Sequence, residues 1–393
     1  MVKKGYKQTE VGVLPEDWAI KKLINLSDGG MQNGTFYEGS RKGNGVYFLN
    51  VGNLYQAAPI IPQTLGKFDA SKDEIDRFRV KNGDLFFTRS SIVPSGIAYC
   101  NWYKDSGDNT TVFDSHVVRF KTDTDQVNPM YLYLQCVSQE SRKYFISNAK
   151  VATMTTIDQA QIGNCLIPVP SLTEQKNIAE AISDADRIIR LLEKLIIKKK
   201  AIKQGAMQEL LTGKRRLPGF SGNWQTISLK KALSVGHGMS QHDVACPTGR
   251  YPILATGGVI GQANRYLWNA PSVLIGRKGT INKPQYMDKP FWSIDTLFYT
   301  KINEGYCPKF LYYVFCRIDW LSYNEASGVP SLSSKTIESI EVQVPDYREQ
   351  CAIAGALTDI DTEIEALEQK SGKYRQVKQG MMQQLLTGKI RLM

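Results

Sequence analysis

Two stretches of this sequence decide the fold, because the second repeats the first. One is PSLTEQKNIAEAISDADRIIRLLEKLIIKKKAIKQGAMQELLTGKRRL, from Pro170 to Leu217, and the other is PDYREQCAIAGALTDIDTEIEALEQKSGKYRQVKQGMMQQLLTGKIRL, from Pro345 to Leu392. The copies align without a gap at an offset of 175 residues, and 24 of the 48 positions are identical. A repeat of this length predicts that the segments between the copies are duplicated too, even where they have diverged.

Each copy has the pattern of one long helix whose apolar residues recur in alternating steps of four and three. The recurring residues are Ile178, Ile182, Ala185, Ile189, Leu192 and Ile196 in the first copy, and Ile353, Leu357, Ile360, Ile364 and Leu367 in the second. This is the a/d seam of a coiled coil. The simplest arrangement pairs the two helices with each other, and the seam leaves the direction of pairing open.

The helices have matching start and stop signals. Glu174-Gln175 and Glu349-Gln350 stand near the first turn, where acidic groups suit the positive end of the helix dipole. Gly213 and Gly388 stand near the last turn, where glycine suits a left-handed cap.

The segments between the helices are of a different kind. They are rich in glycine and aromatic residues, with short β-type runs such as Asp84–Thr88 and Ser272–Ile275. We therefore predict a mixed α/β (α+β) protein with two globular domains, separated by two paired helices and related by a pseudo-twofold repeat. The expected boundaries are 1–170 and 214–345 for the domains, and 171–213 and 346–393 for the helices.

Bulk properties narrow the class of protein. A formal charge of +11 favours an anionic partner. Seven scattered cysteines without a CxxC argue against a zinc site or a disulfide framework and favour a reducing compartment. The N-terminus has no signal-peptide pattern, and no run approaches the ~20 apolar residues that span a membrane. We expect a cytoplasmic protein.

Catalytic motifs are missing from the sequence. There is no Asn/Asp-Pro-Pro-Tyr/Phe motif to hold a flipped adenine, no HExxH, and no phosphate loop with its lysine. We expect no cofactor, no metal and no catalytic residue in this chain.

Polar and basic loops at matching places of the two domains are better supported, since Arg can grip guanine and small hydroxyl residues can hold phosphates. The first pair follows equivalent predicted strands, the second precedes the long helices, and the third lies near the front of each domain. In the first domain the candidate DNA-binding residues are Gln32, Asn33, Thr35, Thr88, Arg89, Ser90, Ser91, Lys150, Thr153 and Thr155. In the second they are His237, Gln262, Asn264, Arg277, Lys278, Thr280, Ser327, Ser331 and Ser333.

The whole chain resembles the specificity subunit of type I restriction-modification systems. The resemblance rests on the order domain, helix, domain, helix, on the Leu-Leu-Thr-Gly-Lys ends at Leu210–Lys214 and Leu385–Lys389, and on Trp18 and Trp224 at the domain entries. It implies that each domain reads one half of a split double-stranded DNA target. It also implies antiparallel helices that bind two methyltransferase subunits using S-adenosylmethionine, joined by restriction/translocase subunits that use ATP and Mg²⁺.

Two alternatives stay open at this point. The chain could be the recognition subunit of a related type II restriction-modification system, which the neighbouring genes would distinguish. It could instead be a coiled-coil interaction scaffold without nucleic acid, which salt-dependent binding of duplex DNA would eliminate.

Overall fold

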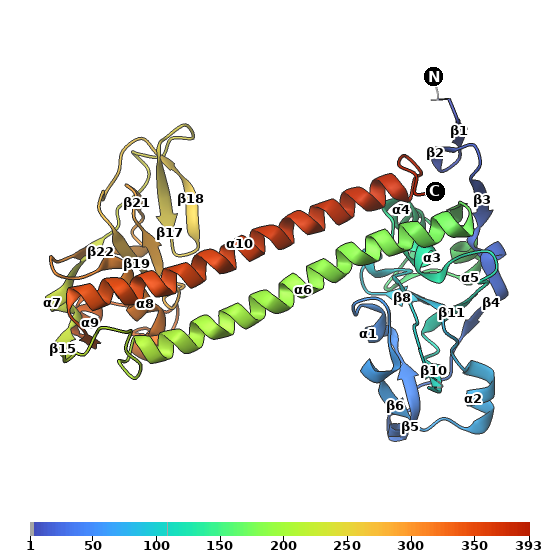
Figure 1. Ribbon diagram of the computed structural model, residues 1–393, viewed down its shortest axis with the longest axis horizontal. Helices are drawn as coiled ribbons and strands as arrows, with labels where there is room; N and C mark the ends of the chain where they lie inside the picture. Colours follow the sequence, from blue (N-terminus) through green and yellow to red (C-terminus); the bar gives the residue numbers. More distant parts are fainter. Residues whose placement is uncertain (1–3, 108) are drawn as a thin grey trace. The chain divides into compact units, whose positions relative to one another are not determined.

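The computed structural model describes residues 4–107 and 109–393 (Figure 1). The chain divides into two compact units. Unit 1 contains the chain up to Leu191 together with Ser371–Met393, and unit 2 is Leu192–Lys370. The division falls inside the two long helices, α6 (Leu172–Leu210) and α10 (Tyr347–Leu385). Each unit therefore combines one globular domain with part of both helices.

Unit 1 is built on small sheets. A four-stranded antiparallel sheet has the order β4 (Ser27–Asn33), β11 (Val117–Thr122), β7 (Leu85–Thr88), β9 (Cys100–Trp102). A mixed sheet has the order β10 (Thr111–Phe113), β5 (Lys42–Leu49), β6 (Gly66–Phe68), with β10 parallel to β5. Two strand pairs are β14 (Leu166–Val169) with β3 (Ala19–Lys22), and β1 (Tyr6–Thr9) with β2 (Gly12–Pro15). The short helices are α1 (Val51–Leu54), α2 (Lys72–Phe78), α3 (Pro129–Cys136), α4 (Gln139–Ser147) and α5 (Gln159–Gly163).

Unit 2 repeats this topology. Its four-stranded sheet has the order β16 (Leu233–His237), β22 (Leu297–Ile302), β19 (Ser272–Gly276), β20 (Gln285–Met287). Its mixed sheet has the order β18 (Gly258–Ala263), β17 (Tyr251–Ala255), β21 (Trp292–Ser293), with β21 parallel to β17. The remaining elements are β15 (Gln225–Ser228) paired with β23 (Glu341–Val344), and the helices α7 (Leu229–Ala232), α8 (Pro308–Arg317) and α9 (Ser334–Ser339). The predicted duplication of the segments between the helices is confirmed.

Both long helices contribute to the core of each unit. In unit 1, Ile178 and Ile182 at the start of α6 pack in one cluster with Leu385 and Leu386 at the end of α10. In unit 2, the cluster holds Leu210 and Leu211 from the end of α6, with Ile353 and Leu357 from the start of α10. Burial of these side chains ties each helix pair to the domain beside it, at roughly 1.5–3 kcal/mol for each fully buried aliphatic side chain.

Ion pairs set the direction of the helices within each unit. In unit 1, Lys378 Nζ lies 2.7 Å from Asp186 Oδ1. In unit 2, Lys203 Nζ lies 2.5 Å from Asp361 Oδ1, at the positions that the repeat makes equivalent. The start of one helix thus faces the end of the other in both units, so the pairing is antiparallel. Lys199 Nζ also lies 2.7 Å from Glu363 Oε2, so α10 pairs with a second lysine of α6.

An arginine that follows the end of each long helix binds a buried carboxylate at the start of the other. In unit 1, Arg391 Nε lies 2.6 Å from Glu174 Oε1, and its guanidinium lies 5.8 Å from the centre of the Trp18 ring. In unit 2, Arg216 Nε lies 2.5 Å from Glu349 Oε1, with Trp224 at the same 5.8 Å. We call these two arrangements the arginine corners. Trp18 Nε1 also donates to Glu174 at 3.1 Å.

The glutamine beside each corner carboxylate joins helix and domain. Gln175 Nε2 donates to the carbonyl of Pro170 at 2.9 Å, and its Oε1 accepts from Asn128 N, the N-cap of α3, at 2.8 Å. Gln350 makes the same two bonds, to Pro345 O and from Cys307 N, at 2.9 Å each. The repeated Glu-Gln pair therefore fixes the first turn of each long helix to its domain, a role beyond the helix dipole.

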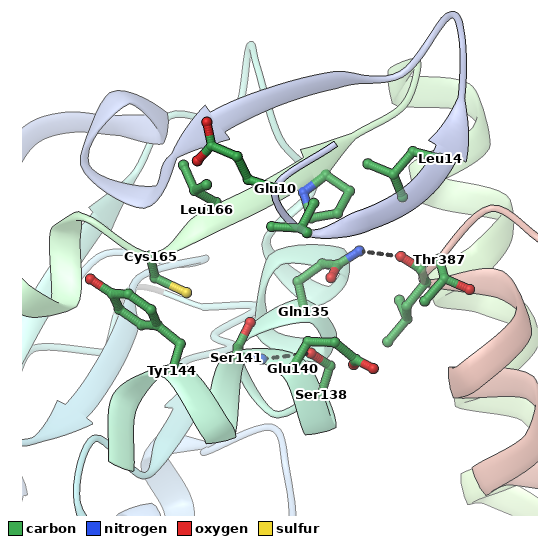
Figure 2. A pocket seen from close by; sticks show the side chains of 13 residues that line it. Glu10, Leu14, Gln135, Ser138, Glu140, Ser141, Tyr144, Cys165, Leu166 and Thr387 are labelled. Atoms are coloured by element: carbon green, nitrogen blue, oxygen red, sulfur yellow. Dashed lines mark hydrogen bonds between the residues drawn. The ribbon is translucent and has the colours of Figure 1, made fainter. Parts of the chain in front are cut away.

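The end of α10 docks against α3 beside an apolar cavity of about 380 Å³ (Figure 2). Gln135 Nε2 donates to the carbonyl of Leu386 at 2.9 Å, across the chain from α3 to the last turn of α10. Gly388 then has φ +65° and Gly213, after α6, has φ +69°, as the left-handed caps predicted from the sequence require.

The arginine corners make a prediction about stability. We expect Glu349→Gln to lower the free energy of unfolding clearly, because a buried amide cannot accept both of the charged hydrogen bonds that Arg216 donates. Glu174→Gln should cost less, since Arg391 keeps Asp17, whose Oδ2 lies 2.7 Å from its Nη2. Urea unfolding of the purified variants measures both values. The control is Glu180→Gln, an exposed residue 3.9 Å from Lys176, which should cost under about 0.5 kcal/mol. Equal losses for all three variants would contradict this account.

Candidate nucleic-acid interface

A recess of about 660 Å³ in unit 1 collects several of the predicted residues. Gln32, Asn33, Thr35 and Arg89 line it. Asn33 is the last residue of β4, and Arg89 directly follows the last residue of β7. Both strands flank β11, so the two residues lie at the same end of the sheet. The following residue, Gly34, passes so close to the backbone that an added Cβ would lie 1.9 Å from Phe113 O. Glycine is therefore required at that point.

The recess is lined by polar groups held in fixed orientations. Asn33 Nδ2 donates to Ser115 O at 2.9 Å, and Asn33 Oδ1 accepts from Gln159 Nε2 at 2.7 Å. Gln32 Nε2 donates to Arg77 O at 3.2 Å, while its Oε1 is buried without a partner in the described part of the chain. The Arg89 side chain is exposed. This combination of a free cation with oriented amides suits the donor and acceptor pattern of base edges.

Thr35 lines the recess, but its hydroxyl is already bonded within the domain. Its side chain is buried, and its Oγ1 donates to Glu74 Oε1 at 2.5 Å. Glu74 also accepts from Arg41 and from the backbone N of Ser71 at 2.8 Å. Hydrogen bonding by the Arg41 guanidinium lowers the pKa of Glu74 to about 2, although partial burial of the carboxyl opposes the shift.

Two predicted loops of unit 1 meet in a small sheet next to the recess. Its order is β12 (Lys150–Val151), β13 (Thr155–Thr156), β8 (Ser90–Ser91), and Thr155 lies opposite Ser91. The residue after β13 donates to the loop as well, since Ile157 N bonds Arg89 O at 3.2 Å. Lys150 and Thr153 are exposed, and Ser90 and Ser91 are half-buried. The structure therefore brings these two loops together.

Thr88 and Thr155 lie inside the domain rather than on this surface. Thr88 is fully buried, where its Oγ1 donates to Gly96 O at 2.7 Å and accepts from Tyr99 N at 2.9 Å. Thr155 is 2% exposed on the central strand of the small sheet. Thr88 is the last residue of β7, and all four residues of this strand are buried because both of its faces are covered. Both residues support the loops, and neither faces a ligand.

A smaller recess of about 250 Å³ occupies the corresponding place in unit 2. It is lined by His237, Arg277, Lys278, Ser331 and Ser333, all predicted from the sequence. Strand register shows the equivalence, because Asn33 lies opposite Val118 and His237 lies opposite Phe298, the second residue of β11 and of β22. Gly238 matches Gly34, since its added Cβ would lie 1.8 Å from Ile294 O.

The loops around the unit 2 recess are joined as in unit 1. Lys278 and Ser331 form an isolated antiparallel β-bridge. Beside it, Leu332 N donates to Arg277 O at 3.0 Å, and Gly279 N donates to Pro330 O at 2.8 Å. Arg277 and Lys278 are exposed.

Four predicted residues do not line this recess. Thr280 is half-buried in the following loop, Ser327 is exposed in the loop before Ser331, and Gln262 and Asn264 lie on or just after β18, in the other sheet.

Several residues that line the recesses were missed by sequence reasoning. They are Met31, Phe36, Arg77, Phe78, Ser115, His116 and Gln159 in unit 1, and Phe298 and Ser334 in unit 2. Arg77 comes from α2 and Gln159 from α5, so tertiary packing alone brings them to the strand ends. The sequence offers one signal, since His116 follows Asp114 by two residues just before β11. In the structure the His116 side chain is exposed, and its Nδ1 lies 2.8 Å from Asp114 Oδ1.

Residues 4–107 and 109–393 contain neither a cluster of metal ligands nor a membrane-spanning helix. In that part of the chain, no group of three or more His, Cys, Asp or Glu residues is placed to hold a metal ion. No helix among these residues has the length and hydrophobicity to cross a membrane.

Comparisons with known proteins identify the family. The model of the type I restriction modification DNA specificity domain matches twice, at residues 15–200 and 222–374. The chain belongs to this family. The DNA-specificity subunits of type I restriction-modification systems recognise DNA and are not themselves catalytic, so this chain is a non-catalytic DNA-recognition subunit. The family match does not favour the type II reader or the scaffold without nucleic acid.

Relatives and solved structures agree with this family. A putative type I restriction enzyme MjaX specificity subunit of Methanocaldococcus jannaschii is 24% identical over 424 residues, covering 99% of this chain and 97% of the relative. The MjaVIII specificity subunit of the same organism is 24% identical over 334 residues, covering 72% and 75%. The crystal structure of the S subunit from M. genitalium shares the fold, with a TM-score of 0.65, 15% identity, and coverage of 94% of this chain and 96% of that one.

Glu74 makes a prediction about pH dependence. Its pKa in the folded chain, about 2, lies below its ordinary value of 4.5, so the ionised carboxylate stabilises the fold above pH 4.5. This contribution is lost as the pH falls from about 4.5 to about 2. We expect Glu74→Gln to flatten the fall in urea midpoint between about pH 6 and pH 3, relative to the unaltered chain. Glu140→Gln, on an exposed residue of α4, is the control for the loss of one carboxylate. A Glu74→Gln profile parallel to that of the unaltered chain would contradict the assignment.

Proposed function

We propose that each globular domain reads one half of a bipartite, asymmetric target in double-stranded DNA. In this proposal the recess around Arg89 reads one half and the recess around Arg277 reads the other. The paired helices set the separation of the two readers and bind two methyltransferase subunits. The observation that carries the proposal is the recurrence of a recess at the same topological position of both units, lined by different side chains.

The difference between the recesses supports an asymmetric target. Register makes Asn33 equivalent to His237, so an amide with a donor and an acceptor stands where the other unit has an imidazole. Arg77 and Gln159 add a cation and an amide to the first recess, and Ser333 and Ser334 add hydroxyls to the second. Side chains with different donor and acceptor patterns select different base edges, and the shared arginine position suits guanine in both.

The helix surfaces support binding of further subunits. α6 exposes Leu191, Leu195 and Ile197, which are 58%, 38% and 69% exposed. Leu191 and Leu195 lie one turn apart on the same side of α6, whereas Ile197 lies on another side, and the pair of leucines is a surface that a partner subunit could cover. A solved structure similar in fold, with a TM-score of 0.57, 14% identity and coverage of 96% of this chain and 99% of that one, comes from work on complex assembly of the type I restriction-modification system.

The partner subunits would supply the chemistry. Methyltransferase subunits would carry S-adenosylmethionine and transfer its methyl group to adenine in each half-site. Restriction/translocase subunits would use ATP and Mg²⁺. The seven cysteines are all free, which fits a complex that works in the reducing cytoplasm.

The first prediction concerns the two arginines. Arg89→Ala and Arg277→Ala should each weaken binding to one half-site by about 1–3 kcal/mol and relax the base requirement at one position. The target is found first, by methylation-sensitive sequencing of a host that expresses the chain with its methyltransferase subunits. Binding of that complex is then measured on duplexes altered in either half.

The matched controls are Arg79→Ala in unit 1 and Arg317→Ala in unit 2. Both arginines are exposed, and neither lines a candidate recess. Equal weakening on specific and random duplexes would show that Arg89 or Arg277 contacts phosphate rather than a base. Unchanged binding by both variants would show that the Arg89 and Arg277 recesses do not read the half-sites.

The second prediction concerns the helices as a ruler. Seven residues with the same apolar pattern are inserted into both helices, after Leu191 in α6 and after Lys370 in α10. Lengthening both together preserves the ion pairs within each unit, such as Lys203–Asp361. Two turns add about 10 Å of helix, and DNA rises about 3.4 Å per base pair. The preferred gap should grow by about one to three base pairs, with the bases of each half unchanged.

Sequencing the methylated motif of the altered complex measures the gap. The control inserts the same seven residues into α6 alone, which should lower stability because the helices no longer match in length. An unchanged gap with full methylation by the doubly lengthened chain would show that the helices do not set the spacing.

A further inference from the structure

Large apolar side chains are exposed at one end of the small sheet β12-β13-β8. Ile92 is 85% exposed, Val151 69%, Val93 53% and Met154 45%. Thr155 lies opposite Ser91 in antiparallel register, so the next residues outward, Met154 and Ile92, come to the same end of the sheet. Val151 enters the same turn, where Ala152 N donates to Met154 O at 3.3 Å. We call these four side chains the apolar tip.

The loop that carries Ile92 and Val93 is anchored at its base. Gly96 O accepts from Thr88 Oγ1 at 2.7 Å and from Tyr55 at 3.3 Å. Arg142, on α4, donates from Nη1 to Ala98 O at 2.7 Å and from Nη2 to Ser95 O at 2.9 Å. Gly96 also approaches Ser91 closely, because an added Cβ would lie 2.3 Å from Ser91 Oγ. Hydrogen bonds therefore fix the backbone that carries Ile92 and Val93, and these side chains are already exposed in the absence of a partner.

The surroundings of the apolar tip indicate DNA as its partner. Arg89 immediately precedes β8 and Lys150 begins β12, so one exposed cation lies next to the small sheet and another lies on it. Arg89 also lines the candidate recess. Cations beside an apolar projection suit a duplex, whose phosphates lie outside and whose apolar surfaces are the stacked base faces.

We propose that the apolar tip inserts into the duplex at the first half-site and partly unstacks one base step. This inference rests on the proposed function, since it requires the Arg89 recess to face DNA. Ile and Met are among the residues that proteins use as such wedges, and pyrimidine–purine steps unstack most easily. Opening a step beside the recess lets the recess approach bases that the closed stack would shield.

The corresponding loop of unit 2 presents a smaller apolar surface. It runs from Ser327 to Ser331 and is joined to the Arg277 loop by the Lys278–Ser331 bridge. Val329, which is 62% exposed, stands there between Gly328 and Pro330. We therefore expect unstacking at the half-site read by unit 1 and not at the half-site read by unit 2.

The test uses the complex of the full chain with its methyltransferase subunits and the duplex found by methylation sequencing. Adenines of both halves, except the methylated ones, are replaced singly by 2-aminopurine, whose fluorescence rises when its base unstacks. The variants are Ile92→Ser with Met154→Ser, Arg89→Ala, and the control Val13→Ser, on an apolar residue that is 40% exposed on β2.

We expect a rise at one step of the first half with the unaltered chain and with Val13→Ser. The Ile92→Ser/Met154→Ser variant should lose that rise and bind about tenfold more weakly, with the second half still read. The proposal is overturned if this variant keeps both the rise and the affinity, or if affinity falls although the unaltered chain never shows a rise. In either case, weaker reading of the first half by Arg89→Ala would still support the proposed function. If Arg89→Ala has no effect on binding, the proposed function of the recess is itself refuted.

Discussion

The buried pairing of an arginine with a carboxylate at each corner is the constraint on which the rest of the structure depends. Glu349 is fully buried and Glu174 is 1% exposed, so each needs a cation to be tolerated inside the protein. The cations, Arg216 and Arg391, come from just beyond the end of the opposite helix. The start of one helix is thereby fixed to the end of the other, which selects the antiparallel arrangement within each unit.

The two domains show how one scaffold carries two surfaces. Backbone hydrogen bonds of the sheets fix strand order and register. The four-stranded and the mixed sheets have the same strand order in both units, and the last residues of β4 and β16 have the same register. Side chains at the strand ends take no part in that ladder, so Asn33 in one unit and His237 in the other occupy the same site without altering the sheet. A recognition surface made of such residues can change while the helices and their corners stay the same.

The sequence predicted the parts of the fold that depend on periodicity. The seam residues Ile178 and Ile353 are buried as expected, and matching loops such as those of Arg89 and Arg277 reach matching recesses. The seam alone leaves the direction of pairing open, because an a/d seam is compatible with either direction, and the antiparallel direction that the structure confirms was implied by the family resemblance. The buried position of Thr88 and the arrival of Gln159 at the first recess depend on tertiary packing, which a linear pattern does not contain.

The core of unit 1 has a consequence for biosynthesis. Leu385 and Leu386, in the last turn of α10 and just after it, pack with Trp18 and Leu23 near the N-terminus, whereas every residue of the unit 2 core lies between Leu210 and Leu357. On the ribosome, the core of the domain translated first therefore cannot close until the end of α10 has been translated. The second domain needs no segment beyond the start of α10 for its core cluster. Until the end of α10 has been synthesised, the nascent first domain exposes an apolar surface that Leu385 and Leu386 later cover, and in this interval it is open to aggregation or chaperone binding.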